Sequence, residues 1–389
     1  MSIQFRVVYI LNSPSKHGGA TKALLNMLEG LTDKGSIPFV ILPHHGGLCD
    51  ELNRRNIKFI LIPYFNSAYP KFYNKKNIAL FIPRLLRNLL INYIATKKII
   101  TYIQEIKPDI IHTNVGPIDI GFNAAKKLKV PHVWHIREYQ DLDFNMHAFP
   151  SKLIFLKKLQ SEDNYPIAIT RGVFNHFEMK NNAKIIYDGV LKKSKTVFIQ
   201  KKEKYFLFAG RLEENKGIRN LIHAFADFTN NIKDYKLYIA GDTTDLSYKQ
   251  TLVSLIKENN LCEYVVFLGM RDDICEVMAK ATALVVPSFF EGFGFITVEA
   301  MFNSCLVIGN NSAGTKEILE LENLGILYSG HNELVTAMQR VIRNGIESYF
   351  PMIIKAQERA VALYSQEQNV NAVYKFYNEI INNKITVIL

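Results

Sequence analysis

The sequence predicts an α/β protein with two domains, each built on a mainly parallel sheet. Strand and helix patterns alternate along the whole chain, which is typical of parallel strands joined by helices. The 389 residues exceed what one hydrophobic core usually organises. A lysine-dense connector without periodicity begins after Val190. We therefore expect one domain at residues 1–190, a second at 191–368, and a final helix at 369–389.

Short apolar, β-branched runs bounded by turn residues predict buried strands, and apolar residues recurring every three or four positions predict helices. In the first half we expect strands at residues 5–11, 38–42, 59–62, 110–113, 132–136 and 167–169. The helices of this half are expected at residues 19–34, 49–55, 82–106 and 118–128.

The second half repeats the alternation. Its strands are expected at residues 205–208, 236–240, 265–267, 283–286 and 306–309. Its helices are expected at residues 217–229, 248–259, 274–279, 296–303, 315–321, 332–344 and 352–363.

The composition indicates a cytoplasmic protein with an anionic partner. A net charge of +11 suits nucleic acid, a membrane surface or a phosphorylated ligand. The four cysteines are dispersed without metal spacing, which predicts reduced thiols. The N-terminus enters an apolar strand without a cationic leader, and no run reaches the roughly 18 apolar residues of a spanning helix.

The segment at residues 287–300 predicts a site for a ligand with phosphate and hydroxyl groups. An apolar strand pattern leads into a turn with Gly292 and Gly294, and a helical pattern follows. The unpaired amides of a helix N-terminus bind anions. Glu291 in the turn and Glu299 in the helix can accept hydrogen bonds from sugar hydroxyls. Taken alone, two glutamates eight positions apart also fit a solvated loop and helix.

This segment resembles the Glu-x7-Glu signature of the family-four retaining glycosyltransferases (glycosyl transferases group 1). That family has the GT-B fold, with two Rossmann-like domains facing each other across a cleft. The resemblance implies that Glu291 contacts the donor sugar and that Glu299 holds the nucleotide ribose. It also implies that the turn binds sugar and phosphate through Gly292, Phe293, Gly294 and Phe295.

A second motif, Gly-Arg-Leu-x-x-x-Lys-Gly, occupies residues 210–217. A predicted strand ends at Gly210, and Arg211 and Lys216 follow before a helix. Arginine offers a fork and lysine a point charge, which together suit a diphosphate. The motif resembles the second hallmark of the same family, in which the two cations stabilise the leaving diphosphate.

Two features of the first half match the family's pattern, and two charged residues beside the second are candidate acceptor contacts. Gly18 and Gly19 follow the first predicted strand, where glycines allow the backbone to approach a phosphate or sugar. His135 ends a predicted strand, the usual place for ligand residues in open α/β sheets. The resemblance implies that His135 contacts the donor sugar. Arg137 and Glu138 are expected to bind the acceptor or to pair with each other.

The sequence departs from the family's pattern at three positions near the expected donor site, and it contains one motif that resembles a metal site of another fold. Glu317 matches the family's Gly-Gly-x-x-Glu turn near the donor, but the first glycine is Ala313. The usual Gly and Pro after the Glu-x7-Glu helix are Ser304 and Leu306, which leaves the nucleotide open. The Asp-Leu-Asp at residues 141–143 resembles a metal motif of another fold but lies in a polar loop. We expect no metal and no cofactor, since cations take the metal's role.

Residues 69–107 form a basic stretch interleaved with aromatic residues. A basic, aromatic, amphipathic segment suits an anionic membrane surface, and the alternative is a basic solvated helix face. No nucleic-acid motif accompanies the charge. The cations, against the single acid Glu105, are Lys71, Lys75, Lys76, Arg84, Arg87, Lys97, Lys98 and Lys107.

These features predict a retaining, metal-independent hexosyltransferase. The donor is expected to be a UDP- or GDP-sugar, and the acceptor a saccharide or lipid-linked saccharide of a surface polysaccharide. In GT-B proteins the final helix often crosses back onto the first domain, which we expect here. The rivals are a nucleotide-sugar 2-epimerase and a non-catalytic GT-B subunit that binds a partner transferase. Neither is expected to keep both glutamates together with the Arg211–Lys216 pair.

Overall fold

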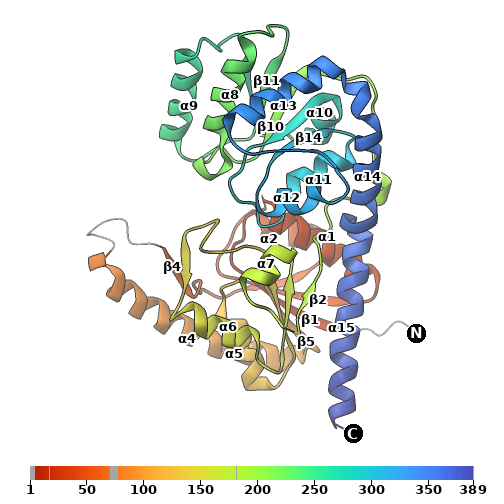
Figure 1. Ribbon diagram of the computed structural model, residues 1–389. Coiled ribbons are helices and arrows are strands. Elements are labelled where there is room, and N and C mark those ends of the chain that lie inside the picture. Colours follow the sequence, from red (N-terminus) through yellow and green to blue (C-terminus); the bar gives the residue numbers. More distant parts are fainter. Residues whose placement is uncertain (1–4, 17, 71–77, 181, 389) are drawn as a thin grey trace. The chain divides into compact units, whose positions relative to one another are not determined.

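The computed structural model describes residues 5–16, 18–70, 78–180 and 182–388 (Figure 1). The chain divides into two compact units. The first contains residues 1–189 together with 366–389, and the second contains residues 190–365. The division at Gly189 lies beside the boundary expected at residue 190, whereas the second unit ends at Ser365 because the last helix packs into the first unit.

The first unit is built on a seven-stranded parallel sheet with the order β3-β2-β1-β5-β6-β8-β9. The order reverses between β1 and β5, which makes that position the topological switch point of the sheet. The strands are β1 (Arg6–Leu11), β2 (Ile37–Leu42), β3 (Lys58–Leu61), β5 (Ile110–Asn114), β6 (His132–Ile136), β8 (Asn164–Ala168) and β9 (Lys184–Ile185).

Helices on both faces of this sheet bury its central strands, as a doubly wound sheet requires. The last helix, α15, places Val373 and Tyr377 in the same core as β1 and α1. The helices are α1 (Gly19–Asp33), α2 (Gly47–Arg54), α4 (Phe81–Ile106), α5 (Asp119–Leu128), α6 (Lys152–Leu159), α7 (Arg171–His176) and α15 (Gln366–Ile388).

The second unit has a six-stranded parallel sheet with the order β12-β11-β10-β13-β14-β15. Its switch point lies between β10 and β13. The strands are β10 (Glu203–Ala209), β11 (Lys236–Ala240), β12 (Val265–Gly269), β13 (Ala281–Val286), β14 (Leu306–Asn310) and β15 (Ile326–Tyr328). The helices are α8 (Ile218–Thr229), α9 (Leu246–Glu258), α10 (Ile274–Lys280), α11 (Phe295–Phe302), α12 (Ala313–Glu320), α13 (His331–Asn344) and α14 (Phe350–Tyr364), with short 3₁₀ turns at η1 (Lys193–Lys195), η2 (Glu214–Lys216) and η3 (Ile346–Tyr349).

The sequence did not predict several short elements. An antiparallel pair, β4 (Ala68–Pro70) with β7 (Met146–Ala148), has three residues in each strand, too few to show a period of two. Helix α6 carries apolar residues on its exposed as well as its buried side, so its pattern is not amphipathic. Three more, α7, β9 and β15, have six residues or fewer.

His132 is a structural histidine at the start of β6. Asn164 donates its amide hydrogens to the carbonyls of Lys158 and Leu159, so its Oδ1 accepts a hydrogen bond from His132 Nδ1 at 2.6 Å. The other ring nitrogen, Nε2, lies 2.8 Å from the Thr113 hydroxyl. Burial lowers the pKa of His132 to about 4, although the Asn164 contact opposes the shift. The ring is therefore neutral at pH 7.

We predict that His132 makes the first unit less stable in mild acid. The unfolded chain binds the proton near pH 6.5 and the folded chain only near pH 4, so stability falls as the pH falls through this window. The full difference is about 3 kcal/mol for this ring. Urea unfolding should be followed by the fluorescence of Trp134, the sole tryptophan, which is fully buried beside His132.

The variant His132→Gln should be less stable than the wild type at pH 7 but should lose less further stability between pH 7 and pH 4.5. His45→Gln, at an exposed histidine of the same unit, is the control and should follow the wild type. Equal acid losses in all three proteins would contradict the assignment.

Candidate active site

The switch point of the second unit gathers the predicted catalytic residues of that unit. β10 and β13 are parallel neighbours, so their carboxyl ends lie at the same edge of the sheet. Arg211 and Lys216 follow β10, and Glu291 follows β13. Open α/β sheets bind ligands at this edge, outside the carboxyl ends of the strands.

Lys216 and Glu291 form an ion pair in which Nζ lies 2.7 Å from Oε1. Both side chains are largely buried, with exposed fractions of 19% and 17%. Gly217 makes the approach possible, because it has a φ of 68° and a Cβ there would lie 2.1 Å from the carbonyl oxygen of Pro287. The sequence predicted roles for both charges but not their pairing. The pair presents a cation and a carboxylate at one position.

The turn after Glu291 ends in a helix N-terminus. Gly294 has a φ of 99° and directly precedes α11. A Cβ on Gly314 would lie 2.2 Å from the carbonyl oxygen of Phe293, so glycine is required where α12 meets the turn. The Gly314 amide donates to the Glu291 carbonyl at 2.9 Å, which fixes the turn. The arrangement is suited to anion binding because the amides of a helix N-terminus point outward along the helix axis.

Arg211 is the more exposed of the two cations. Its guanidinium pairs with Glu213 at 2.8 Å, and its side chain is 59% exposed. Exposed ion pairs contribute only about 0–1 kcal/mol, so this one is easily exchanged for a phosphate. Gly210, which precedes it, has a φ of 153° and continues the backbone from β10 into the loop.

The other predicted donor residues of this unit differ in burial. Glu299 is buried on α11, whereas Glu317 on α12 and Gly292 are partly buried. The Phe293 ring is buried and packs against Tyr364, with centroids 5.6 Å apart. The Phe293 side chain is therefore part of the core, so only its backbone is available to contact a donor. Phe295 is the first residue of α11.

Three buried polar atoms near the turn have no hydrogen-bond partner within the described part of the chain. They are Asn215 Oδ1, Thr297 Oγ1 and Thr315 Oγ1. Thr297 and Thr315 both lie close to Gly294, since a Cβ there would be 3.5 Å from Thr297 Oγ1 and from the Thr315 amide. Buried polar groups are normally satisfied, so these atoms are candidate ligand contacts. Sequence reasoning missed them because the two threonines carry no motif and Asn215 occupies a variable position of its motif.

In the first unit the predicted glycine loop lies at the switch point. Gly18 follows β1 with a φ of 109° and is the residue before α1, which begins at Gly19. A Cβ on Gly18 would meet no atom within 4 Å, so glycine is needed there for the backbone angle rather than for space. The sequence-predicted role of both glycines in donor binding stays a prediction.

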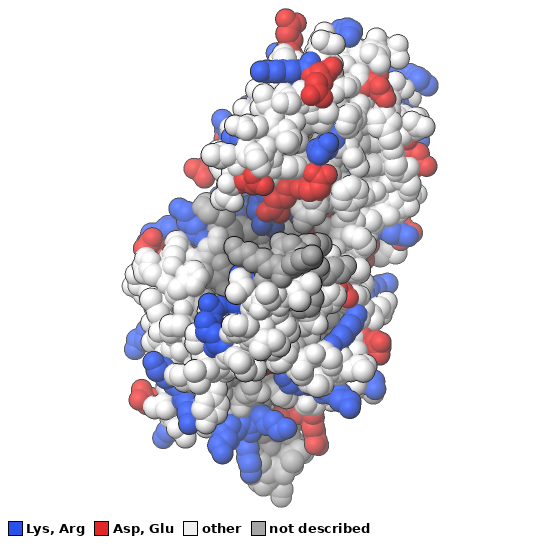
Figure 2. Space-filling view, turned by 90° about the vertical axis from the view of Figure 1, so that its left-hand side faces the viewer, with Lys and Arg blue, Asp and Glu red and all other residues white. Residues whose placement is uncertain are grey.

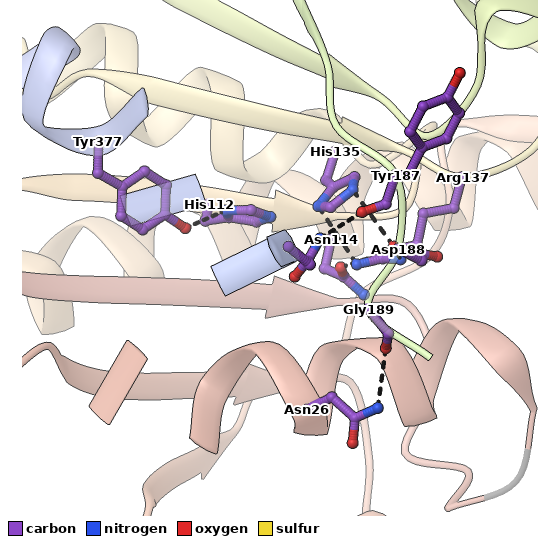
Figure 3. A network of polar contacts seen from close by, with 10 residues as sticks. Asn26, His112, Asn114, His135, Arg137, Tyr187, Asp188, Gly189 and Tyr377 are labelled. Atoms are coloured by element: carbon purple, nitrogen blue, oxygen red, sulfur yellow. Dashed lines mark hydrogen bonds and ion pairs between the residues drawn. The ribbon is translucent and has the colours of Figure 1, made fainter. Parts of the chain in front are cut away.

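His135 lies in a buried polar network at the carboxyl ends of β5 and β6 (Figure 3). Arg137 forms a short ion pair with Asp188 and donates from Nε to Asn114 Oδ1 at 2.9 Å. The expected alternative that Arg137 pairs with Glu138 is wrong, because its carboxylate partner is Asp188. A buried guanidinium needs such a partner, and removing Asp188 would leave the charge uncompensated.

The geometry defines the state of the His135 ring. Burial, reinforced by the charge of Arg137, lowers its pKa well below the ordinary value, so the ring is neutral at pH 7. Arg137 Nη2 lies 3.4 Å from His135 Nδ1. Since arginine only donates, Nδ1 accepts and the proton resides on Nε2. Nε2 lies 3.9 Å from Asp188 Oδ1, too far for a hydrogen bond. His135 is therefore a neutral donor.

The segment 187–189 beside this network is held by two side-chain contacts that the sequence did not predict (Figure 3). Asn26 on α1 donates to the Gly189 carbonyl at 2.9 Å, and Asn369 on α15 donates to the Tyr187 carbonyl at 2.7 Å. Gln366 donates in turn to the Asn26 carbonyl. Amide side chains dispersed over the chain give no pattern from which such contacts can be read.

The acidic residues after β6 form a separate group. Burial, with the nearby charge of Asp143, raises the pKa of Glu138 to about 8, so this partly buried carboxyl is mostly protonated at pH 7. Asp143 accepts from the Tyr139 amide, and Asp141 pairs with His176 at 2.8 Å. Within the described residues, no group of three or more His, Cys, Asp or Glu could hold a metal ion. The acceptor roles of Arg137 and Glu138 stay predictions.

Comparison with known proteins identifies the class. Residues 191–359, nearly the whole second unit, match the family model described as glycosyl transferases group 1. An uncharacterized glycosyltransferase of Methanocaldococcus jannaschii is 26% identical over 362 residues, covering 88% of this chain and 97% of the relative. The second unit therefore matches the glycosyl transferases group 1 family, and the chain is similar to glycosyltransferases over most of its length.

Further similarities extend over the chain. A Campylobacter jejuni enzyme, GalNAc-α-(1→4)-GalNAc-α-(1→3)-diNAcBac-PP-undecaprenol α-1,4-N-acetyl-D-galactosaminyltransferase, is 24% identical over 353 residues, 87% of each chain. The structure of Anabaena Alr3699/HepE in complex with UDP superposes with a TM-score of 0.79 and 19% identity, covering 96% of this chain and 100% of that one. HepE has also been solved with UDP-glucose. The fold is therefore GT-B.

We predict that the Lys216–Glu291 pair acts on turnover more than on stability. Lys216→Ala removes a cation aimed at developing charge, and Glu291→Gln removes the carboxylate that orients the sugar. Either loss should lower kcat about 10²–10³-fold while donor affinity changes less. Initial rates at saturating donor test this directly.

Lys249→Ala is the matched control for this prediction. Lys249 pairs with Asp242 at 3.0 Å in the same unit but on the exposed surface. It should keep wild-type turnover. Turnover within a few-fold of wild type for Lys216→Ala or Glu291→Gln would remove the assigned role.

Proposed function

We propose that the protein transfers a hexosyl unit from a UDP-sugar to a hydroxyl of a saccharide or lipid-linked acceptor, with retention of the anomeric configuration and without a metal. The observation that carries the proposal is the Lys216–Glu291 ion pair at the switch point, beside the N-terminus of α11. A diphosphate requires cations and amides, a sugar requires a hydrogen-bonding carboxylate, and this position offers both.

The donor is assigned to the second unit. Arg211, Lys216 and the amides at Gly292 to Gly294 receive the diphosphate, Glu291 orients the hexose, and Glu299 binds the ribose. UDP is favoured over GDP because the similar HepE binds UDP and UDP-glucose. Binding would exchange the Lys216–Glu291 contact for contacts with the phosphate and the sugar hydroxyls.

The transfer step needs no general base from the protein. The anomeric carbon–oxygen bond to the diphosphate breaks, and the acceptor oxygen bonds to the same face of that carbon. The acceptor proton passes to the departing diphosphate oxygen, so atoms and charge balance. The protein contributes position and charge stabilisation, which suits a site of fixed cations and amides. His135, as a neutral donor, remains assigned to a hydroxyl of the donor sugar.

The acceptor is assigned to the first unit. The Campylobacter jejuni relative acts on an undecaprenol-linked saccharide. By analogy we propose a polysaccharide intermediate as acceptor, on a lipid carrier or free. The basic stretch at residues 69–107 then meets an anionic membrane surface from the cytoplasmic side.

Donor binding tests the second-unit assignment. UDP-, GDP- and ADP-sugars should be compared by thermal stabilisation, and the UDP-sugars are expected to give the largest shift. Glu299→Ala should weaken donor binding through lost ribose contacts, about ten-fold for one hydrogen bond to a charged group. Calorimetric titration measures this loss, with circular dichroism as the folding control. Unchanged affinity in a folded variant would disprove the ribose contact.

Metal independence is tested by chelation. We predict that initial rates in excess EDTA stay equal to those without it, because Arg211 and Lys216 provide the cationic charge. A loss of activity that Mg²⁺ or Mn²⁺ restores would instead point to Asp141 and Asp143 as ligands.

A further inference from the structure

Helix α4 has two apolar faces, and the first unit covers only one of them. The packed face consists of Ala95, Ile99, Ile103 and Ile106, all in the C-terminal half. No residue of α4 before Ala95 is buried, so the N-terminal half of this helix is largely solvent-accessible. Packing against the first unit therefore explains the apolar residues in the C-terminal half of α4 but not those in its N-terminal half.

The N-terminal half carries a stripe of large exposed apolar side chains. The members of this stripe are 45–62% exposed, and intervals of four, three, one and three residues place them on one helix face. Single exposed leucines are ordinary, but a contiguous stripe marks an interaction surface. The stripe consists of Ile82, Leu86, Leu89, Leu90 and Tyr93.

Cations border the stripe. Lys97 Nζ lies 4.5 Å from the centroid of the Tyr93 ring, and the Arg87 guanidinium lies 4.9 Å from that of Phe65. Arg84 and Lys98 are also exposed, on other faces of the helix. Within the described residues, none of these four cations forms an ion pair with an acid, so their charge is uncompensated. Long basic side chains that cover aromatic rings at the edge of an apolar surface are typical of a membrane interface.

The excess positive charge of the whole chain lies in the first unit, which also contains α4. The first unit contains 27 Lys and Arg against 16 Asp and Glu, whereas the second contains 20 of each. Residues 69–107 hold eight of those cations and one acid, although Lys71, Lys75 and Lys76 lie outside the described residues. Figure 2 views the side of the molecule where α4 begins. On this side of the first unit, most of the charged residues are Lys and Arg, and uncharged residues lie between them. The net charge is therefore not a property of the proposed donor site.

We propose that the N-terminal half of α4 inserts its stripe into the interface of a bilayer that contains anionic lipids, with Arg87 and Lys97 among the headgroups at its border. The proposal rests on the membrane contact of the proposed function and deepens it by adding an apolar, salt-resistant component. No helix among the described residues is long and apolar enough to cross a membrane. α4 therefore lies in the interface plane.

Charge decides between a bilayer and a second copy of the chain. A symmetric dimer through the stripe would bring Arg87 and Lys97 of both copies together around one apolar contact, where like charges repel. An anionic bilayer instead attracts each of them, by roughly five-fold in binding per cation at low salt. A bilayer that contains anionic lipids can therefore bury the apolar stripe and also attract the cations beside it.

The test is co-sedimentation with vesicles of phosphatidylcholine alone or with one quarter phosphatidylglycerol. The full-length wild type should bind the mixed vesicles and retain part of that binding in high salt, which screens charge but not apolar burial. The stripe variant Leu86→Ser/Leu89→Ser/Tyr93→Ser should bind about a hundred-fold more weakly or worse, since each of the two leucines contributes about ten-fold. Leu246→Ser/Met270→Ser, at equally exposed sites of the second unit, is the control and should bind as the wild type does.

Insertion is measured separately by fluorescence. A tryptophan introduced by Leu90→Trp should be quenched by lipids brominated on the acyl chain, whereas one introduced by Leu246→Trp should not. The native Trp134 is fully buried and supplies a constant background. Thermal stabilisation by UDP-glucose, measured in every variant, reports the proposed donor site independently of the membrane.

Two results would overturn the proposal. The first is a wild type that ignores mixed vesicles at low salt, or a stripe variant that binds them as the wild type does. The second is a wild-type dimer in sedimentation velocity that the stripe variant dissociates, which would assign the face to a second copy. A failure of UDP-glucose binding with intact vesicle binding would instead count against the proposed function alone.

Discussion

The pairing of β10 with β13 is the constraint on which the candidate donor site depends. Lys216 and Glu291 are far apart in the sequence, and only the adjacency of these two strands brings their loops together. The approach also requires Gly217, because a side chain there would collide with the backbone of Pro287. The glycines of the motifs thus have a steric role in addition to any contact with a ligand. A larger residue at position 217 would displace the loop that carries Lys216.

Much of this architecture could be predicted from the sequence, because alternating periodicities and glycine-bearing turns are local signals. The predicted strand at residues 132–136 matches β6, and the helix expected at 274–279 lies within α10 (Ile274–Lys280). Strand order is not local, so the Lys216–Glu291 and Arg137–Asp188 pairs could not be predicted. The threonines near Gly294 were also missed, because only the folded structure shows that their hydroxyls are buried without a hydrogen-bond partner.

The polar core of the first unit shows how distant segments set the state of one histidine. Tyr377 on α15 bonds to His112 Nδ1 at 2.6 Å, and the His112 ring lies 5.4 Å from that of His135. Burial lowers the pKa of both histidines, so neither adds a positive charge beside Arg137. Asp188 alone balances that guanidinium among the residues that the structure describes. The last helix is therefore part of the environment of His135, and its removal would expose this network to water.

The two units differ in net charge, and this difference separates the proposed binding of the donor from the proposed binding of an anionic surface. The second unit has equal numbers of acidic and basic residues, yet it is the unit assigned to an anionic donor. Local geometry suffices for donor binding, because a helix N-terminus, Lys216 and an exchangeable Arg211 act over a few ångströms. Long-range attraction to an extended anionic surface requires net charge instead, and the first unit holds all of it. In this chain, net charge therefore argues for a surface partner of the first unit, whereas the donor site follows from the arrangement of individual residues.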